Sequence, residues 1–422
     1  MPQRFFIGFA LLMAVFCTSC VTPPEVPPVV SAIDLIRAAD VKRDQGDLAG
    51  AIALYGKAIE LKPKAPYGYV LRGLAKASKG ENDAAIADFT RAIELEPRNA
   101  TTYSVRGNAK MAKGDLDGAI ADHTKVIELE PRYGKAYCNR GIVESEKGEI
   151  DKADADYSKA IKLDPNDAGF YVLRGLLRRG RDDFKAAIAD YDQVIRLEPA
   201  EAGHYGIRAY AKRRTGDLAG AIGDYTRAIE LGSKDAATYY LRAQAKYAKA
   251  EFDQAIADFS KAIELDPKHA AYYRSRGKAK TAKGDYESAI VDYKKAMDLT
   301  KENEYNRFFL TLTLRRLHRD ESPAGLATAI DGWKEGWPKS VGLYLTGKLS
   351  ETDFLAQAEL GKATVVHGQT CEAFYYIGMM HLLANETAQA RTQFEKCLAT
   401  EETEFFEYDL AWAELARMGE KH

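Results

Sequence analysis

Basic and aromatic side chains gather in the second half of a 34-residue periodicity, at positions that share one face of a predicted helix. They are Arg179, Tyr210, Arg213, Arg214, Tyr247, Arg274 and Lys278. Guanidinium and ammonium groups bind carboxylates, and aromatic rings add apolar contact area. One interpretation is a docking site for an anionic peptide or a peptide C-terminus. The other is a solvated helix face, and the residues alone leave both open.

Sequence patterns for catalysis and metal binding are missing. The seven histidines form no His-Glu-x-x-His pair, and no Gly-x-Ser-x-Gly elbow occurs. The segment Gly342–Lys348 matches the start of a phosphate-binding loop, but Leu349 stands where Ser or Thr would hold magnesium. We therefore predict no catalytic residue, no metal ligand and no cofactor.

Composition places the chain among globular proteins without a nucleic-acid signature. The 422 residues are 46% apolar, and the formal net charge is −2. No repeat carries the dense basic stripe that phosphate binding requires, so nucleic acid is not an expected partner. In a repeat protein of this length, the core is a long ribbon of packed helices.

The periodic pattern runs eight times from Ala32 to Lys301 without insertion or deletion. Its eighth position is Gly or Ala, its twentieth is always Ala, and its twenty-fourth is a ring. Small residues allow helix axes to approach closely, and each ring is expected to fill the space they leave. Glycine near position fifteen and proline at the repeat end mark the helix boundaries. The sequence predicts an all-α stack of helical hairpins.

Charged residues at two repeat positions predict a recurring ion pair. Repeats two to eight all have Arg at position seven and Asp at position twenty-three, whereas the first repeat has Ala38 and Leu54. In an antiparallel hairpin that turns near position fifteen, these two positions lie at similar heights. We expect one Arg–Asp pair in each of these repeats, with a structural role.

This pattern resembles the tetratricopeptide repeat family in its period, its two-helix unit and its alternation of small and large residues. The resemblance implies a right-handed superhelical solenoid whose first helices line a concave groove for partner peptides or domains. The basic and aromatic residues named above fall on groove positions.

The family's carboxylate clamp is only partly matched. Asn108 and Asn139 stand at its two Asn positions, whereas Ser104, Gly169 and Leu173 replace its cationic residues. We include Asn108 and Asn139 among the candidate groove residues.

The N-terminus resembles a bacterial lipoprotein signal. Residues 1–20 contain Arg4, a 12-residue apolar run and Cys20. The run is shorter than the roughly 20 residues of a membrane span, which favours a signal peptide. Acylation of Cys20 would anchor the protein in a membrane, and cleavage without lipidation is the alternative.

The following residues suggest where such an anchor would hold the protein. Residues 21–31 are rich in proline and predict a stiff linker. Because Val21 follows the cysteine in place of Asp, the resemblance implies an outer-membrane lipoprotein that faces the periplasm.

The repeat register is lost after Lys301. Residues 302–370 are expected to form a degenerate helical region, and 371–422 a terminal hairpin with a capping helix. Cys371 opens the first helix of this hairpin and Cys397 nearly closes the second. Antiparallel packing brings them together, so we predict a disulfide between them in an oxidising periplasm.

The C-terminal hundred residues resemble those of bacterial tetratricopeptide lipoproteins of the NlpI type. The motifs are Trp337-Pro338, 343–350, 374–378 and 405–415. The resemblance implies a periplasmic adaptor, a homodimer, and partners that include peptidoglycan hydrolases and a protease.

Three functional hypotheses follow from the sequence. The first is a lipid-anchored periplasmic scaffold that recruits protein partners through its groove. The second is a non-catalytic subunit of an envelope machine, such as pilus assembly or polysaccharide export. The third is an enzyme with an unrecognised site. Unsatisfied basic and aromatic groups in the groove would favour the first hypothesis, and a large apolar outer patch would favour the second.

Overall fold

The computed structural model describes residues 31–300, 304–319, 324–360, 363–400, 402 and 406–419. The predicted signal peptide, its Cys20 and residues 21–30 of the linker lie outside the described residues. The chain divides into two compact units, residues 1–149 and residues 150–422. This boundary falls inside the fourth repeat, between its two helices.

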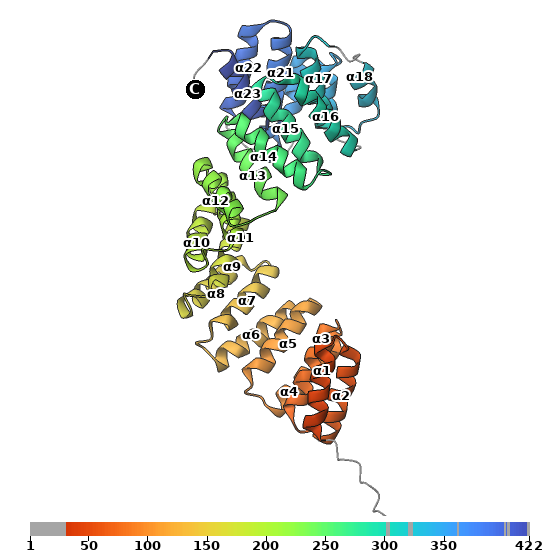
Figure 1. Ribbon diagram of the computed structural model, residues 1–422, viewed down its shortest axis with the longest axis vertical. Helices are drawn as coiled ribbons and strands as arrows, with labels where there is room; N and C mark the ends of the chain where they lie inside the picture. Colours follow the sequence, from red (N-terminus) through yellow and green to blue (C-terminus); the bar gives the residue numbers. More distant parts are fainter. Residues whose placement is uncertain are drawn as a thin grey trace, which may run out of the picture. The chain divides into compact units, whose positions relative to one another are not determined.

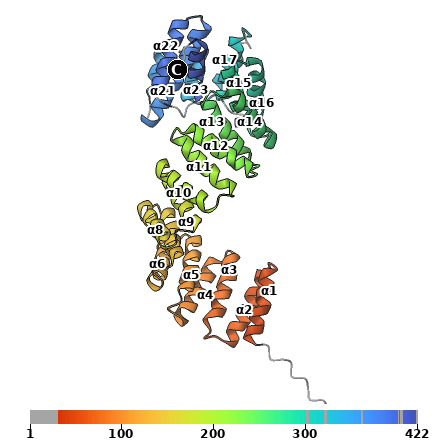
Figure 2. The same cartoon turned by 60° about the vertical axis from the view of Figure 1, so that its left-hand side comes forward.

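The first unit is a stack of helices in which each helix packs on the next (Figures 1 and 2). Helices of adjacent repeats also touch, as α3 and α5 do. The helices are α1 (Ala32–Asp44), α2 (Leu48–Leu61), α3 (Pro66–Ser78), α4 (Asn82–Leu95), α5 (Ala100–Lys113), α6 (Leu116–Leu129) and α7 (Gly134–Glu146).

The second unit continues the hairpin pattern and ends in a larger helical cluster. Its repeat helices are α8 (Ile150–Leu163), α9 (Ala168–Gly180), α10 (Phe184–Leu197), α11 (Ala202–Arg214), α12 (Leu218–Glu230), α13 (Ala236–Ala248), α14 (Phe252–Leu265), α15 (Ala270–Lys283) and α16 (Tyr286–Leu299). The cluster is built from α17 (Glu304–Arg316), α18 (Ala324–Asp331), α19 (Trp337–Leu345), α20 (Glu351–Ala358), α21 (Ala363–Leu383), α22 (Thr387–Ala399) and α23 (Phe406–Arg417).

Close packing between small and large residues holds each hairpin together. A methyl group added at Gly73 would lie 2.6 Å from the Phe89 ring, and one added at Gly277 would lie 2.8 Å from the Tyr293 ring. Both rings are fully buried. The predicted filling of the small-residue space by a ring is confirmed at these positions. The predicted all-α fold of stacked hairpins is confirmed as well.

The turn inside a hairpin uses glycine for a backbone conformation that other residues rarely adopt. Gly114, for example, has a φ of +88° and ends α5 in the left-handed region. The next helix, α6, begins directly afterwards, with the Asp115 carboxylate accepting a hydrogen bond from the Gly118 amide. The helix boundaries therefore follow from local sequence.

The predicted Arg–Asp ion pair is confirmed in six repeats. In the third repeat, Arg106 donates to both carboxylate oxygens of Asp122, at 2.8 and 2.7 Å. The same arrangement joins Arg72–Asp88, Arg174–Asp190, Arg208–Asp224, Arg242–Asp258 and Arg276–Asp292. The seventh predicted pair, Arg140–Asp156, would connect the two units and stays a prediction.

A second cation, which the sequence analysis overlooked, completes each of these ion pairs. Position eleven of the repeat is Lys or Arg wherever the pair is described, and its side chain also reaches the aspartate. In the eighth repeat, Lys280 lies 2.8 Å from Asp292, whose side chain is 2% exposed. The aspartate side chains are therefore more buried than those of a typical surface ion pair. The signal in the sequence is the Lys or Arg that occupies position eleven in seven of the eight repeats.

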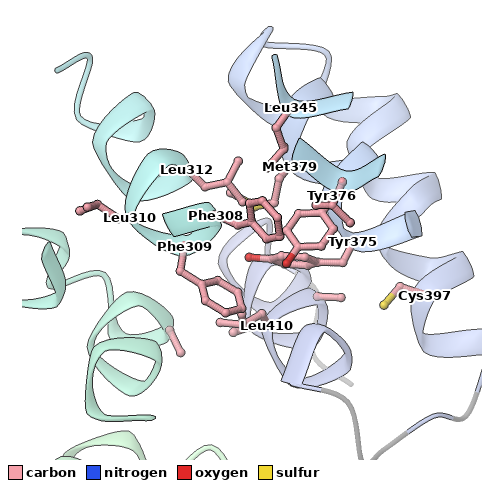
Figure 3. Close-up of a cluster of buried hydrophobic side chains, with 14 of the residues drawn as sticks. Phe308, Phe309, Leu310, Leu312, Leu345, Tyr375, Tyr376, Met379, Cys397 and Leu410 are labelled. Atoms are coloured by element: carbon pink, nitrogen blue, oxygen red, sulfur yellow. The ribbon is translucent and has the colours of Figure 1, made fainter. Parts of the chain in front are cut away.

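The helices after the repeats enclose an aromatic core (Figure 3). Phe308 of α17 points toward Tyr376 of α21, with ring centroids 5.9 Å apart. Phe309 stacks on Tyr293 of α16, also at 5.9 Å. Trp337 stacks on Phe354 with ring centroids 5.0 Å apart. Trp333 and Trp337 therefore pack against this core.

The two cysteines of the terminal hairpin lie side by side in this cluster. The sulfur atoms of Cys371 and Cys397 are 3.3 Å apart, and both residues are fully buried. The structure brings them together as thiols. Their disulfide stays a prediction. Cys138, in the first unit, is also a buried thiol.

The final helix, α23, packs on α21 and α22 and also against α15, the first helix of the eighth repeat. Arg417 donates to the carbonyl oxygens of Thr281 and Ala282, at 2.9 and 3.0 Å, so it caps the C-terminal end of α15. Arg316 of α17 binds Glu414 of α23 at 2.6 Å. Helix α23 therefore covers one face of the eighth repeat, besides ending the stack.

Candidate partner-binding site

The second unit contains a pocket of about 480 Å³ between repeat helices and the final helix. Its lining is contributed by the end of α11, the turn that follows it and the start of α12, by α13, α14 and α15, and by the first turn of α23. The lining residues are Arg213, Arg214, Gly216, Leu218, Gln244, Tyr247, Ala248, Phe259, Ser275, Lys278, Tyr408 and Asp409. Three of these residues are cationic, one is acidic and four carry aromatic or amide groups.

The last turn of α11 supplies two guanidinium groups that aromatic rings hold in place. The Arg213 guanidinium lies 5.7 Å from the centre of the Tyr210 ring, and that of Arg214 lies 4.7 Å from the Phe184 ring. Arg179 of α9 lies on Tyr210 as well, at 5.6 Å. The Nε of Arg213 is buried, and the Arg213 side chain lies close enough to Tyr225 to oppose the rise that burial causes in the pKa of its hydroxyl, although the two groups do not meet the geometry of a hydrogen bond.

Lys278 brings a third positive charge to the pocket from α15. Only 3% of the residue is exposed, and its ammonium group lies 4.3 Å from the centre of the Phe309 ring. Burial lowers the pKa of Lys278 to about 7, and the nearby Glu407 carboxylate opposes this shift. Such a lysine gains from a ligand that brings negative charge.

Aromatic side chains form the apolar part of the lining. Tyr247 of α13 is 5% exposed and packs against Phe252, with ring centroids 5.6 Å apart. Its hydroxyl has no hydrogen-bond partner in the described part of the chain. Burial raises the pKa of Tyr247 well above its usual value, so the hydroxyl keeps its proton and can donate it in a hydrogen bond.

The final helix supplies the acidic residue of the pocket. Asp409 stands in the first turn of α23, beside Tyr408. Burial raises the pKa of Asp409 to about 7, while the positive charges of Lys278 and Arg213 act against this shift. No described residue forms an ion pair with Asp409.

A buried polar network lies next to the pocket and fixes the helices around it. Glu372 of α21 accepts hydrogen bonds from the Trp337 indole at 2.7 Å and the Tyr305 hydroxyl at 3.2 Å. Tyr376 donates to Glu407 of α23 at 3.3 Å. Burial raises the pKa of Glu372 to about 8, with a further contribution from Glu407. These contacts connect the start of α23 to α17, α19 and α21.

Four of the residues predicted from sequence meet in this pocket. They are Arg213, Arg214, Tyr247 and Lys278. Arg179 and Tyr210 stand behind them in the cation–π stack and are partly buried. Arg274 is partly buried on α15 and does not line the pocket. Asn108 and Asn139 belong to the first unit, where Asn108 is exposed and Asn139 is partly buried.

Sequence reasoning missed the pocket residues that come from the final helix. Tyr408 and Asp409 belong to a segment that was expected only to cap the stack. Gln244 occupies the ninth repeat position, as the predicted groove residue Lys278 does, so its place could have been inferred. Ser275, at the sixth position, carried no such signal.

The described residues show no sign of a metal centre or a membrane helix. No group of three or more His, Cys, Asp or Glu side chains in the described ranges could hold a metal ion. Within the same ranges, no helix combines the length and apolar character needed to cross a bilayer.

Models of the tetratricopeptide repeat match most of the helical hairpins. A TPR repeat model matches residues 39–80, and tetratricopeptide repeat models match 66–99, 134–167, 172–236, 236–269, 270–303 and 372–400. The chain belongs to the tetratricopeptide repeat superfamily. The match at 372–400 covers most of the two helices expected to form the terminal hairpin.

The chain is similar to several solved structures, and no curated protein sequence matches it. YrrB, described as a TPR protein with an unusual peptide-binding site, is 22% identical with a TM-score of 0.41; the match covers 44% of this chain and 96% of YrrB. The MamA protein is 27% identical, with a TM-score of 0.39 and coverages of 40% and 92%. A tetratricopeptide repeat protein from Parabacteroides merdae is 21% identical, with a TM-score of 0.42 and coverages of 58% and 97%.

Proposed function

We propose that the protein is a lipid-anchored adaptor of the bacterial cell envelope that recruits protein partners through the pocket of its second unit. The observation that carries this proposal is the convergence of Arg213, Arg214 and Lys278 on one aromatic-lined pocket. The Tyr247 hydroxyl, buried there without a hydrogen-bond partner among the described residues, adds a donor for a ligand. A buried donor without a hydrogen bond costs about 1–3 kcal/mol, and an acceptor on a bound ligand would remove that cost.

Electrostatics favours a negatively charged group on the partner. Three cationic side chains and one acidic side chain line the pocket. Aromatic contacts hold the two arginines of α11 in position before binding, which reduces the entropy lost when a carboxylate binds. The pocket volume lies within the range of sites that hold a small group, so it suits the end of a peptide segment and not a folded domain.

The location rests on the N-terminal sequence alone. The apolar run before Cys20 and the proline-rich segment that follows support an acylated cysteine, a stiff linker and a position at the outer membrane facing the periplasm. The resemblance to NlpI-type lipoproteins extends the proposal to recruitment of peptidoglycan hydrolases or a protease, and to a homodimer.

The outer surface gives less support to the alternative hypothesis, in which the protein is a subunit of an envelope assembly machine. Exposed large apolar residues among those described are spread over both units, for example Val41 on α1 and Val291 on α16. A subunit interface would be expected to gather such residues in one patch.

Affinity purification from envelope extracts tests the adaptor role. We expect the variant Arg213→Glu/Arg214→Glu to recover at least tenfold less partner protein than the unmodified chain. The matched control Arg196→Glu/Arg227→Glu reverses two exposed charges on α10 and α12 and should recover partners normally. Cys20→Ala should move the protein from the membrane to the soluble fraction. Equal recovery with both charge-reversed variants would contradict the pocket as the docking site.

A further inference from the structure

The charges of the pocket come from different helices and have both signs. Helices α11 and α15 provide Arg213, Arg214 and Lys278, whereas α23 provides Asp409. A ligand with only negative groups gains from the three cations but brings its charge close to a carboxylate. A ligand that carries an anionic and a cationic group can satisfy both kinds of lining residue.

Asp409 is held in this place by a well-anchored helix. Leu410 and Leu415 of α23 are buried, and Glu414 binds Arg316. The first turn of α23 therefore cannot easily turn its carboxylate away from the pocket. The environment disfavours the charged form of Asp409, since burial raises its pKa, and the positive charges of Lys278 and Arg213 offset this only in part. An ionisable group kept at such a cost in a pocket indicates contact with a ligand.

The remaining walls suit a long aliphatic side chain with a charged end. Tyr247, Phe259 and Tyr408 present aromatic rings, which pack against methylene groups and attract cations. The volume of about 480 Å³ admits one or two residues of a polypeptide. Both ligand charges must then come from one residue or from two neighbours.

We propose that the pocket binds the C-terminal lysine or arginine of a partner protein, with the terminal carboxylate at Arg213 and Arg214 and the side-chain cation at Asp409. This inference rests on the proposed function, which assigns partner docking to the same pocket. It adds a residue preference, and it assigns Asp409 the role of selecting that residue.

Fluorescence anisotropy with the purified full-length chain tests the preference. Three labelled hexapeptides differ only at the end: lysine with a free carboxylate, glutamate with a free carboxylate, and lysine with a carboxamide. We expect the first to bind at least tenfold more tightly than either of the others. In Asp409→Asn the preference for lysine over glutamate should fall below twofold, and in Asp409→Lys it should reverse. Asp253→Asn, an exposed change on α14, should leave the preference intact.

The possible results separate this inference from the proposed function. Equal affinity for the lysine and glutamate peptides, with loss of both in Arg213→Glu/Arg214→Glu, would overturn the lysine preference and keep the docking pocket. Binding of the lysine peptide that survives the double arginine change would overturn both proposals. Free lysine that competes as well as the peptide would show an amino-acid site and overturn the polypeptide ligand. Unchanged thermal unfolding of Asp409→Asn would exclude misfolding as the cause of a changed preference.

Discussion

The third and eighth repeats share one framework, yet their first helices present different surfaces. On α5, Asn108 and Ala112 are exposed. The corresponding residues of α15, Lys278 and Ala282, are buried. Their Arg–Asp pairs have the same geometry, so the hairpins themselves do not explain the contrast. The difference lies in the chain that follows the repeats.

This contrast shows how a repeat protein can produce a local site from a uniform array. The framework positions are set by packing inside each hairpin, and they recur in both units. The groove positions are free to vary, and in the second unit they meet a non-repeating helix. A pocket arises where α23 lies over α15, because the two surfaces come from unrelated sequence patterns.

Detaching the final helix should expose α15 as α5 is exposed, and we expect this change to give the largest effect. In Leu410→Ala/Leu415→Ala, two buried side chains of α23 are truncated. Each such change typically costs about 2–5 kcal/mol, so we expect a loss of about 5 kcal/mol in the attachment of α23. Hydrogen exchange should become at least tenfold faster in α15 and stay the same in α5. Protected α15 amides in this variant would show that another element covers the eighth repeat.

Removing the framework aspartate should test whether the two units are built alike. Asp122→Ala in the first unit and Asp292→Ala in the second each leave an arginine and a lysine without their carboxylate. Breaking a fully buried pair costs about 3–5 kcal/mol, but these cations are partly exposed, so we expect about 2 kcal/mol in each unit.

Unit-specific hydrogen exchange under native conditions measures these two losses. Asp117→Ala, which removes an exposed partner of Lys147, serves as the control and should cost less than about 0.5 kcal/mol. A difference of more than about 1 kcal/mol between Asp122→Ala and Asp292→Ala would show that the shared geometry does not carry equal energy.

The repeat framework could be predicted because its determinants are local and periodic. The spacing of small residues, rings, glycines and prolines specifies the hairpin, and the ion pair follows from the antiparallel geometry. Within the site, the four lining residues from α11, α13 and α15 were predictable because they occupy groove positions of the same template.

The contribution of the final helix could not be predicted by the same reasoning. Arg417 reaches the carbonyl oxygens of Thr281 and Ala282, more than a hundred residues earlier, and no periodicity connects these positions. Asp409 also has an ordinary explanation in sequence, since an acidic residue in the first turn of a helix complements the helix dipole. Only the packing of α23 shows that its carboxylate lines a pocket.

The smallest expected effect concerns the ring position of the third repeat, where His123 stands in place of a tyrosine or phenylalanine. Its ring is 1% exposed, and neither ring nitrogen has a hydrogen-bond partner among the described residues. Phe89 fills the equivalent space against Gly73. We therefore expect His123→Phe to stabilise the first unit by about 1 kcal/mol at pH 7, because it removes buried polar atoms that are unsatisfied.

The same substitution should change how the first unit responds to acid. Burial lowers the pKa of His123 to about 4 in the folded state, against 6.5 for the free side chain. Below pH 6.5 the unfolded chain takes up a proton that the folded chain refuses until about pH 4, so stability falls as the pH drops through this window. At pH 5 the loss is about 2 kcal/mol, and His123→Phe should remove it. Urea unfolding of the first unit at pH 7 and pH 5, followed by hydrogen exchange, measures the change. The same acid dependence in both proteins would mean that another group controls it.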